Sequence, residues 1–245
     1  MQTKQRSKYK KIIIGIVSIL GILFVGSWLV LQTKMHQPSI QAQRVSESAK
    51  EEKHYTFYSG GNKESIGLIF YPGGLVDPAS YSLWAQQVAQ AGYDVYVVHF
   101  PLNLAVLAPN RAEEIQAAHP QKRFVLAGHS LGGVMASRYL VSNADAIEGM
   151  VFLASYPDQK GALNTLEVPV LSITGTNDGV LNAEAYESAK QYLPSDTRYE
   201  VIKGGNHAGF GSYGKQKGDH QATISNDEQQ AAIRQQLIQW LEQFD

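Results

Sequence analysis

Three residues that together can activate a hydroxyl group each follow an apolar run of the chain. Ser130 comes directly after residues 123–127, Asp178 follows 169–174, and His207 follows 198–202. A serine hydroxyl is a poor nucleophile until a histidine accepts its proton, and an acid must fix the tautomer of that histidine. The order Ser, Asp, His with these placements predicts a nucleophile, an acid and a base at one edge of a sheet.

The segment Gly128-His129-Ser130-Leu131-Gly132 matches the G-x-S-x-G pattern. A strand that turns at once into a helix strains the serine backbone and leaves no room for side chains on the flanking glycines. The apolar FVLA before this segment and the helical LGGVMASRYLV after it supply that context. The alternative is a glycine-rich turn with a solvated serine.

Other residues compete for the roles of base and acid. The chain has seven histidines, and His99 stands at a strand end, but it precedes the serine and so breaks the expected order. His207 combines position, order and glycine neighbours. For the acid, Asp158 and Asp219 remain rivals of Asp178.

Backbone donors for a developing oxyanion are expected after the run 66–71, where the chain reads Tyr71-Pro72-Gly73-Gly74-Leu75. Glycines let a backbone approach a substrate closely, and such N–H groups contribute strongly to acyl transfer. We expect the N–H groups of Gly74 and Leu131 to be the donors, with Leu75 in place of Gly74 as the alternative; the other reading is a simple tight turn. The residues expected to contact substrate are Gly73, Leu75, His129, Phe210 and Tyr213. Phe210 and Tyr213 stand in the long segment 208–222. The alternative interpretation is that these two are packed core aromatics.

Apolar runs alternate with helical patterns along the rest of the chain, which is typical of a mostly parallel sheet covered on both faces. Ligands bind such sheets at the carboxyl ends of the strands. Only 11 residues, 158–168, lie between Pro157, just after the run 149–154, and Pro169, so no large helical lid is expected there. The expected strands are 54–59, 66–71, 94–98, 123–127, 149–154, 169–174 and 198–202, and the expected helices are 78–91, 111–118, 131–142, 183–192 and 226–243.

The N-terminal region has a different composition. Residues 1–11 form a basic tail, and 12–31 are twenty residues without a charge, long enough for a helix to cross a bilayer. The positive-inside rule leaves the tail in the cytoplasm and the rest of the chain outside. A cleaved signal peptide is the alternative. Residues 32–53 are polar and predict a flexible spacer, with the folded domain at 54–245.

Composition excludes several classes of site. The chain has no cysteine, which excludes disulfides, thiolate metal sites and a cysteine nucleophile. Beyond residue 31 there are 16 basic and 22 acidic residues, a poor electrostatic match for nucleic acid. We expect no metal and no cofactor.

These motifs together resemble the small serine hydrolases described as alpha/beta hydrolase fold 5, which are similar in scale to dienelactone hydrolases. The resemblance covers nearly all of 66–240 and rests on YPGGLVDPASY, FPLNLAVL, GHSLGG, LASYP, GTNDGV and GGNHAGFGSYGKQKGD. It implies an α/β-hydrolase fold with the triad Ser130, Asp178 and His207. Asn103 and Asp219 fall in these motifs without an implied role.

The expected function is hydrolysis of a small carboxylic ester through an acyl-enzyme by a membrane-anchored protein. The same triad also permits amide or thioester hydrolysis, or transfer of the acyl group to an acceptor other than water. A non-catalytic surface binding module is the alternative from another class. The expected partners are a small-molecule ester and, through 12–31, the lipid bilayer.

Overall fold

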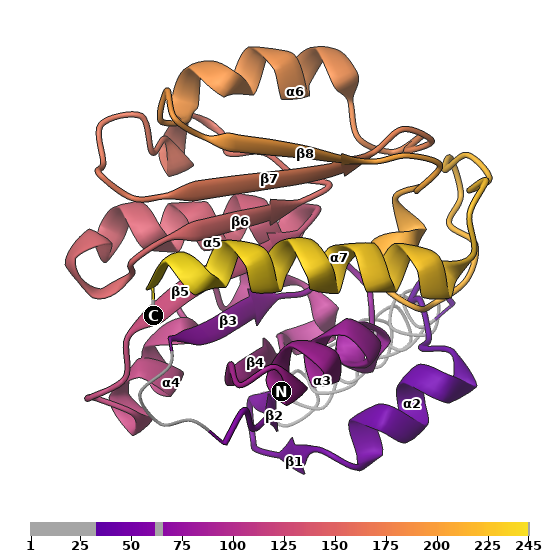
Figure 1. Ribbon diagram of the computed structural model, residues 1–245, viewed down its shortest axis with the longest axis horizontal. Helices are drawn as coiled ribbons and strands as arrows, with labels where there is room; N and C mark the ends of the chain where they lie inside the picture. The colour runs from indigo at the N-terminus through magenta and orange to yellow at the C-terminus, as the bar shows by residue number, and fades with distance from the viewer. Residues whose placement is uncertain (1–32, 62–65, 245) are drawn as a thin grey trace, which may run out of the picture. The chain divides into compact units, whose positions relative to one another are not determined.

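The computed structural model of the chain describes residues 33–61 and 66–244. It divides into a unit of residues 1–35 and a unit of residues 36–245, and every element named below belongs to the second. The described part of this unit is built on a sheet of eight strands in the order β1-β2-β4-β3-β5-β6-β7-β8 (Figure 1). The strands are β1 (Lys50–Glu51), β2 (Tyr55–Tyr58), β3 (Gly67–Tyr71), β4 (Val95–Val98), β5 (Phe124–His129), β6 (Met150–Leu153), β7 (Val170–Gly175) and β8 (Arg198–Ile202).

The sheet is parallel from β4 to β8, and only β1 and β2 run antiparallel to their neighbours. Strands β3, β4, β5 and β6 are buried along their whole length, as strands covered on both faces must be. The carboxyl ends of β3, β5, β7 and β8 therefore meet at one edge, and the loops that follow them lie there.

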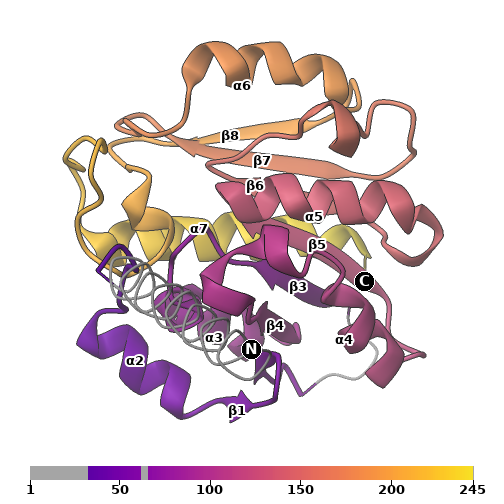
Figure 2. The same ribbon diagram turned by 180° about the vertical axis from the view of Figure 1, so that it is seen from behind.

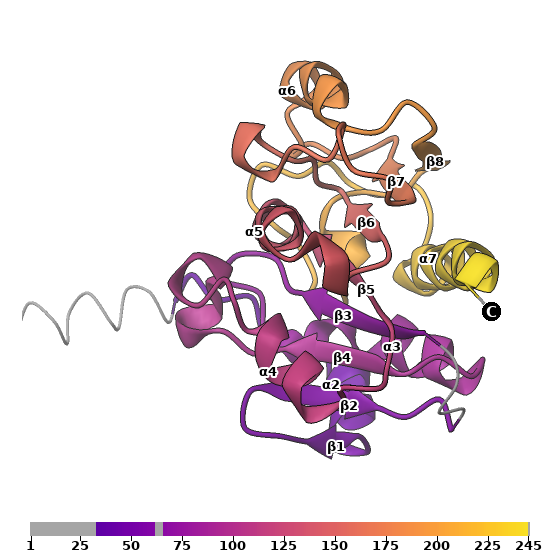
Figure 3. The same cartoon turned by 90° about the vertical axis from the view of Figure 1, so that its left-hand side faces the viewer.

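Helices cover both faces of the sheet. The α-helices are α2 (Ile40–Glu47), α3 (Ser82–Gln90), α4 (Ala112–Ala118), α5 (Leu131–Ser142), α6 (Ala183–Ala189) and α7 (Asn226–Leu241). On one face α3 and α7 pack Trp84 and Leu237 against the sheet; on the other, α4 and α5 pack Ile115 and Leu140. Figure 1 shows α7 across the sheet, Figure 2 shows α5 on the opposite side, and Figure 3 shows the sheet between them.

The seven strands and five helices expected from the sequence are all present, with a turn of 3-10 helix (Pro78–Tyr81) preceding α3. The connection between β6 and β7 is described throughout and contains only the short turn Gln159–Gly161. The expectation of a site without a large lid at this position is confirmed.

The flexible spacer expected at 32–53 is wrong from His36 onward. The His36 N–H donates to the Leu75 carbonyl at 2.8 Å, and the Ser39 N–H donates to the Ser212 carbonyl at 2.6 Å. Helix α2 follows, with Ala42 fully buried. The folded unit thus begins at His36 rather than at residue 54, because backbone bonds to distant loops hold a segment that has little apolar periodicity of its own.

Across the described ranges, no helix has both the length and the apolarity needed to cross a membrane. The anchor expected at 12–31, like the basic tail at 1–11, lies outside the described residues.

Candidate active site

Ser130 lies at the sharp turn between β5 and α5. Its backbone has φ 52° and ψ −123°, a strained conformation for a residue with a side chain, of the kind that persists only where the surroundings enforce it. The Ser130 N–H donates to the Leu153 carbonyl at 3.1 Å, and the Ser155 hydroxyl donates to the Ser130 carbonyl at 2.6 Å. Both peptide groups of the strained residue are therefore held from β6 and the loop after it.

The flanking glycines are required by close packing, as the sequence predicts. A Cβ atom at Gly128 would lie 2.5 Å from the Gly133 nitrogen, and one at Gly132 would lie 2.1 Å from the Tyr71 carbonyl oxygen. Neither contact is possible for a real side chain, so the turn can form only with glycine at these two positions.

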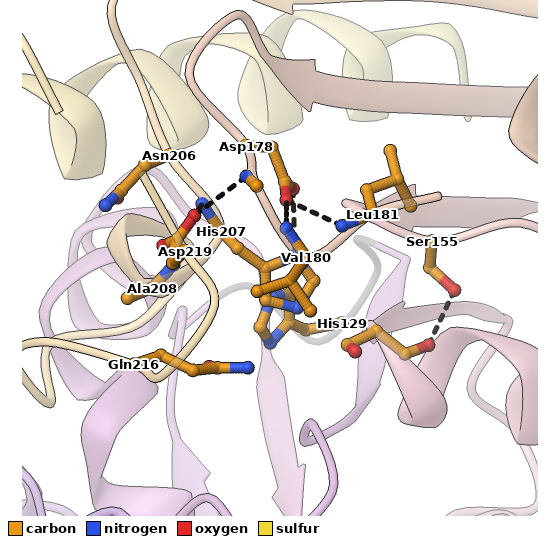
Figure 4. A network of polar contacts seen from close by, with 12 residues as sticks. His129, Ser155, Asp178, Val180, Leu181, Asn206, His207, Ala208, Gln216 and Asp219 are labelled. Carbon is orange, nitrogen blue, oxygen red and sulfur yellow. Dashed lines mark hydrogen bonds and ion pairs between the residues drawn. The ribbon is translucent and has the colours of Figure 1, made fainter. Parts of the chain in front are cut away.

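Asp178 and His207 are joined by a hydrogen bond of 2.8 Å between Asp178 Oδ2 and His207 Nδ1 (Figure 4). Their side chains are only 3% and 2% exposed. The other carboxylate oxygen, Oδ1, accepts the N–H groups of Val180 and Leu181, each at 2.8 Å. Burial raises the pKa of Asp178, but the bonds from His207, Leu181 and Val180 outweigh it, so the net pKa is lowered. Asp178 is therefore an ionised acid fixed in orientation.

Asp219 connects the loop that carries the acid to the loop that carries the base. Its Oδ1 accepts the Gly179 N–H at 3.0 Å and the His207 N–H at 3.3 Å, and its Oδ2 accepts the Ala208 N–H at 2.8 Å (Figure 4). One carboxylate thus links the backbone N–H of Gly179, the residue after Asp178, to the backbone N–H of His207. From the sequence, Asp219 was expected to be no more than a rival acid.

A buried side chain fixes the residue before His207. Gln229 of α7 accepts the Asn206 N–H at 3.0 Å and donates to the Asn206 carbonyl at 2.8 Å. With Asp219 on the following peptide, the backbone on both sides of His207 is held by side chains from distant parts of the chain.

Ser130 and His207 line one small cavity of 180 Å³. The lining of the cavity is mixed: Ser155 and Asn182 are its further polar residues, and the remaining lining is Leu131, Val134, Ala154, Tyr156, Val180 and Leu181. In this arrangement no hydrogen bond joins Ser130 to His207 among the described residues, and such catalytic bonds often tighten only when substrate binds.

The loop after β3 carries the expected oxyanion donors. The Leu75 N–H donates to the Asn103 carbonyl at 2.8 Å and the Gly73 N–H donates to the Tyr81 hydroxyl at 2.9 Å, so both are already used. Between them lies Gly74, where an added Cβ would be 3.0 Å from the Leu131 side chain. Leu131 opens α5, and the first N–H groups of a helix have no intrahelical acceptor. This geometry favours Gly74 over Leu75 as the partner of Leu131.

His129 is buried behind the site, at 1% exposure. Its Nδ1 lies 2.9 Å from the Tyr81 hydroxyl. The same hydroxyl accepts the Gly73 N–H at 2.9 Å, so Tyr81 links His129 to the loop after β3. Burial first, and the nearby His207 second, lower the pKa of His129 well below its ordinary value. His129 is therefore a neutral ring that supports the loop after β3 through Tyr81, with its centroid 4.6 Å from that of His207.

A family model described as the alpha/beta hydrolase family matches residues 67–231. The chain belongs to the α/β hydrolase family. No curated protein matches it, and these comparisons give no support to the expected relation to dienelactone hydrolases.

Solved α/β hydrolase structures share the fold at low sequence identity. One is MGS-MChE2, from a metagenome of sediments of the Mar Chica lagoon in Morocco, with 16% identity, 80% of this chain and 98% of that chain covered, and a TM-score of 0.59. A soluble variant of monoglyceride lipase from Saccharomyces cerevisiae is 11% identical, with 80% of this chain and 94% of that chain covered and a TM-score of 0.59. Naproxen esterase from Bacillus subtilis is 13% identical, with 82% of this chain and 94% of that chain covered and a TM-score of 0.58.

Five residues of this α/β hydrolase were expected to contact substrate, and none of them lines the cavity at Ser130. Phe210 is fully buried and stacks on His129 with 5.7 Å between centroids, and Tyr213 packs against His36 at 5.1 Å. The structure therefore gives the packed-core reading for these two aromatics. Gly73 and Leu75 are bound to Tyr81 and Asn103 as described above, and His129 lies behind the site.

The rival acid Asp158 pairs with Arg138 of α5, with 3.1 Å between Arg138 Nε and Asp158 Oδ1, and it caps the turn Gln159–Gly161. The rival base His99 bonds to Thr56 at 2.8 Å. Within the described residues no cluster of three or more His, Cys, Asp or Glu could hold a metal ion.

Sequence reasoning missed Tyr81, Ser155 and Gln229. Tyr81 and Ser155 stand in the motifs DPASY and LASYP, so the resemblance pointed to their segments without indicating a role. Gln229 stands in a polar stretch of α7, and nothing in the local sequence separates it from its exposed neighbours.

Proposed function

We propose that this α/β hydrolase is a serine esterase that cleaves small carboxylic esters through an acyl-enzyme. The observation that carries the proposal is the buried Asp178–His207 hydrogen bond beside the strained Ser130, with Ser130 and His207 lining one cavity. An ionised acid that orients a histidine next to an exposed serine is the arrangement that nucleophilic acyl transfer requires.

In the first half-reaction Ser130 Oγ attacks the ester carbonyl while His207 Nε2 accepts its proton. The Asp178 carboxylate holds Nδ1 protonated and stabilises the imidazolium. The N–H groups of Gly74 and Leu131 donate to the oxyanion of the tetrahedral intermediate. Collapse of this intermediate expels the alcohol, which takes the proton from His207. Water then repeats the sequence on the acyl-serine, which releases the acid and restores Ser130.

The cavity supports a preference for short acyl groups. Its volume is 180 Å³, and Val134, Val180 and Leu181 give it an apolar wall. This volume is smaller than the roughly 300–1,000 Å³ of sites that take up a drug-sized ligand, which favours a short acyl group. The esterase and lipase named among the structures of similar fold are consistent with ester chemistry.

We further propose that residues 12–31 anchor the enzyme in a membrane, with the catalytic unit on the extracytoplasmic side. The support is the uncharged stretch of twenty residues after a basic tail, which matches the bilayer thickness and the positive-inside rule.

The test is labelling of the full-length protein with a fluorophosphonate probe, followed by turnover of p-nitrophenyl esters of increasing acyl length. We expect Ser130 to label and Ser130→Ala to lose all labelling, whereas Ser142→Ala, at the exposed end of α5, labels normally. Turnover is expected to be highest for acetyl to butyryl esters. A folded wild-type protein that does not label would refute the serine mechanism; labelling without turnover of any ester would point to amide, thioester or transfer chemistry.

A further inference from the structure

We propose that the edge of the sheet that carries the active site rests on the bilayer, and that the substrate is a membrane-held amphiphile bearing a short-chain ester. This inference rests on the proposed function, including the anchor at 12–31. It adds the orientation of the catalytic unit and the physical state of the substrate.

The first support is the length of chain between the anchor and the folded unit. The anchor ends at residue 31, and His36 is already bonded to the loop after β3 through the Leu75 carbonyl and through the Asp77 N–H, at 2.8 and 3.0 Å. Five residue steps span at most about 18 Å even when fully extended. The chain alone therefore keeps His36 within that distance of the end of the anchor.

The second support is the place where the chain joins the unit. His36 pairs with Val76 in a parallel bridge, directly after the segment Gly73–Leu75 that carries the expected oxyanion donor. The attachment is thus on the edge of the sheet that holds the site, beside the catalytic loops. A short tether fixed at this edge holds the site close to the bilayer surface.

The third support is a set of exposed apolar side chains, which we call the apolar rim: Ile40, Leu102, Val106 and Leu107, at 75%, 39%, 46% and 52% exposure. Among the described residues, only three other large hydrophobic side chains are as exposed, Val141, Tyr199 and Val201. Four of these seven exposed side chains thus stand at residue 40 and within 102–107. Single exposed hydrophobic side chains are ordinary, whereas groups of them mark interaction surfaces.

The rim residues stand in segments that are bonded to the loops near the attachment point. Leu102, Val106 and Leu107 stand in the segment after β4 whose Asn103 carbonyl accepts the Leu75 N–H at 2.8 Å. Ile40 begins α2, directly after Ser39, whose side chain bonds to Ser212 at 2.8 Å. All four rim residues therefore belong to segments bonded to the loops around His36.

Basic residues accompany the rim. The loop that follows Tyr213, which packs on His36, carries Lys215 and Lys217; both are exposed, and neither forms an ion pair with any described residue. Apolar side chains flanked by lysines are the combination that inserts at a membrane interface and attracts anionic head groups. A bilayer is the occupant that fits this surface and the tether together.

The size of the cavity then limits the substrate. A site that faces a bilayer meets amphiphiles, and the 180 Å³ cavity at Ser130 is smaller than the roughly 300–1,000 Å³ of sites that take up a drug-sized ligand, which favours a short acyl group. Both conditions are met by a short acyl group esterified to an alcohol that is itself held in the membrane. Hydrolysis would release the short acid into water and leave the alcohol in the bilayer.

Docking can be measured without any enzymatic activity, because the chain has no cysteine. The full-length protein carrying Leu107→Cys, labelled with a nitroxide, is reconstituted into vesicles of phosphatidylcholine and phosphatidylglycerol. The matched control is Val141→Cys, whose native side chain is 39% exposed and lies at the end of α5 remote from Ser130. We expect the label at 107 to be accessible to oxygen and shielded from a water-soluble nickel complex, and the label at 141 to show the reverse. Equal nickel accessibility at both positions would overturn the docking proposal.

A kinetic comparison tests the substrate class. Hexadecyl acetate in vesicles is compared with water-soluble p-nitrophenyl acetate, using wild type, the double variant Val106→Ser/Leu107→Ser, and the control Val141→Ser at the far end of α5. The double variant is expected to lose roughly tenfold in turnover of hexadecyl acetate with p-nitrophenyl acetate unchanged, and a 20-residue Gly/Ser insertion after Lys34 should also slow only the former. Equal losses on both substrates, or none, would overturn the inference while leaving the esterase intact. Absence of both probe labelling and p-nitrophenyl acetate turnover would instead refute the proposed function.

Discussion

At the scale of single residues, the groups proposed to react are held by others that do not react. The Asp178 carboxylate receives two backbone N–H groups besides His207, and the backbone around His207 is bonded to Asp219 and Gln229. Each such bond restricts the conformation of the site before substrate binds. Less conformational entropy is then lost on binding, and the site is preorganised. The supporting residues should therefore affect turnover without contacting substrate.

Asp219→Asn tests this at the carboxylate that joins the two loops. The amide keeps one acceptor oxygen but places an NH₂ group against an N–H donor, so the bonds to Gly179 and His207 on one side, or to Ala208 on the other, are lost. We expect a loss of about 1.5–3 kcal/mol in the free energy of unfolding, typical of bonds to a charged group. A shift of the histidine should lower kcat about 10–100-fold with KM little changed.

The matched control is Asp196→Asn, at an exposed aspartate that takes no part in the site. Stability is read from urea unfolding and turnover from p-nitrophenyl acetate hydrolysis. An Asp219→Asn protein as active as the control would show that Asp219 does not position His207.

His129 predicts a pH dependence of stability. Burial, aided by His207, lowers its pKa in the folded state, while the unfolded chain has the ordinary value of about 6.5. Below that value the unfolded state binds a proton that the folded state refuses, so stability falls as the pH drops from 6.5 toward the folded pKa. The limiting slope is about 1.4 kcal/mol per pH unit for one proton.

His36, His99 and His119 also have lowered pKa values, so the contribution of His129 must be measured as a difference. His129→Gln keeps an acceptor for the Tyr81 hydroxyl and cannot titrate. Urea unfolding between pH 5 and 7.5 should show a shallower slope for this variant than for wild type or for the exposed His220→Gln. Identical slopes in all three proteins would mean that His129 is not kept neutral by the fold.

The sequence was informative about the residues proposed to react because each follows a strand whose apolar run is easy to recognise. Ser130, Asp178 and His207 could be predicted from strand ends and chain order alone. Tyr81 and Gln229 reach the site from more distant segments of the chain, and Asp219 reaches it from the other end of the loop that begins at His207. The bonds that these three make depend on tertiary packing that no local pattern encodes.

At the scale of elements, the same distinction separates the sheet from the N-terminal segment of the unit. Strands β3 to β6 are buried throughout and therefore carry continuous apolar runs. Helix α2 has only one buried side chain, Ala42, so its sequence resembles that of a spacer. It is held by its Ser39 cap and by the Ser82 hydroxyl, which donates to the Ala42 carbonyl at 2.6 Å.

Ala42→Glu tests whether α2 is a part of the folded unit. The new carboxylate would be buried without a partner, which costs about 3–5 kcal/mol where the structure cannot yield. We expect α2 to detach, so that limited proteolysis cleaves within 36–50 much faster than in wild type. The control is Gln41→Glu, an exposed position in the first helical turn, where a negative charge is favourable. Equal cleavage rates for wild type and Ala42→Glu would show that α2 does not depend on this contact.

At the scale of the whole molecule, the boundary between the tether and the catalytic unit determines what the enzyme can reach. A long flexible spacer would let the site sample a wide volume of water, whereas a unit that begins at His36 leaves only a few residues after the proposed anchor. In the proposed arrangement, the side of the membrane on which the unit lies decides which esters it can reach.

The proposed orientation predicts an asymmetric pattern of labelling in intact cells. Single cysteines are introduced into the full-length, naturally cysteine-free chain at Lys4 in the basic tail or at Lys217, which is exposed on the catalytic unit. With a membrane-impermeant maleimide we expect Lys217→Cys to label in intact cells and Lys4→Cys to label only after lysis, because the positive-inside rule keeps the tail in the cytoplasm. The wild-type chain is the control for background labelling. Protection of Lys217→Cys until lysis would refute export, and release of the labelled unit from washed membranes would indicate that the N-terminal segment is cleaved rather than retained as an anchor.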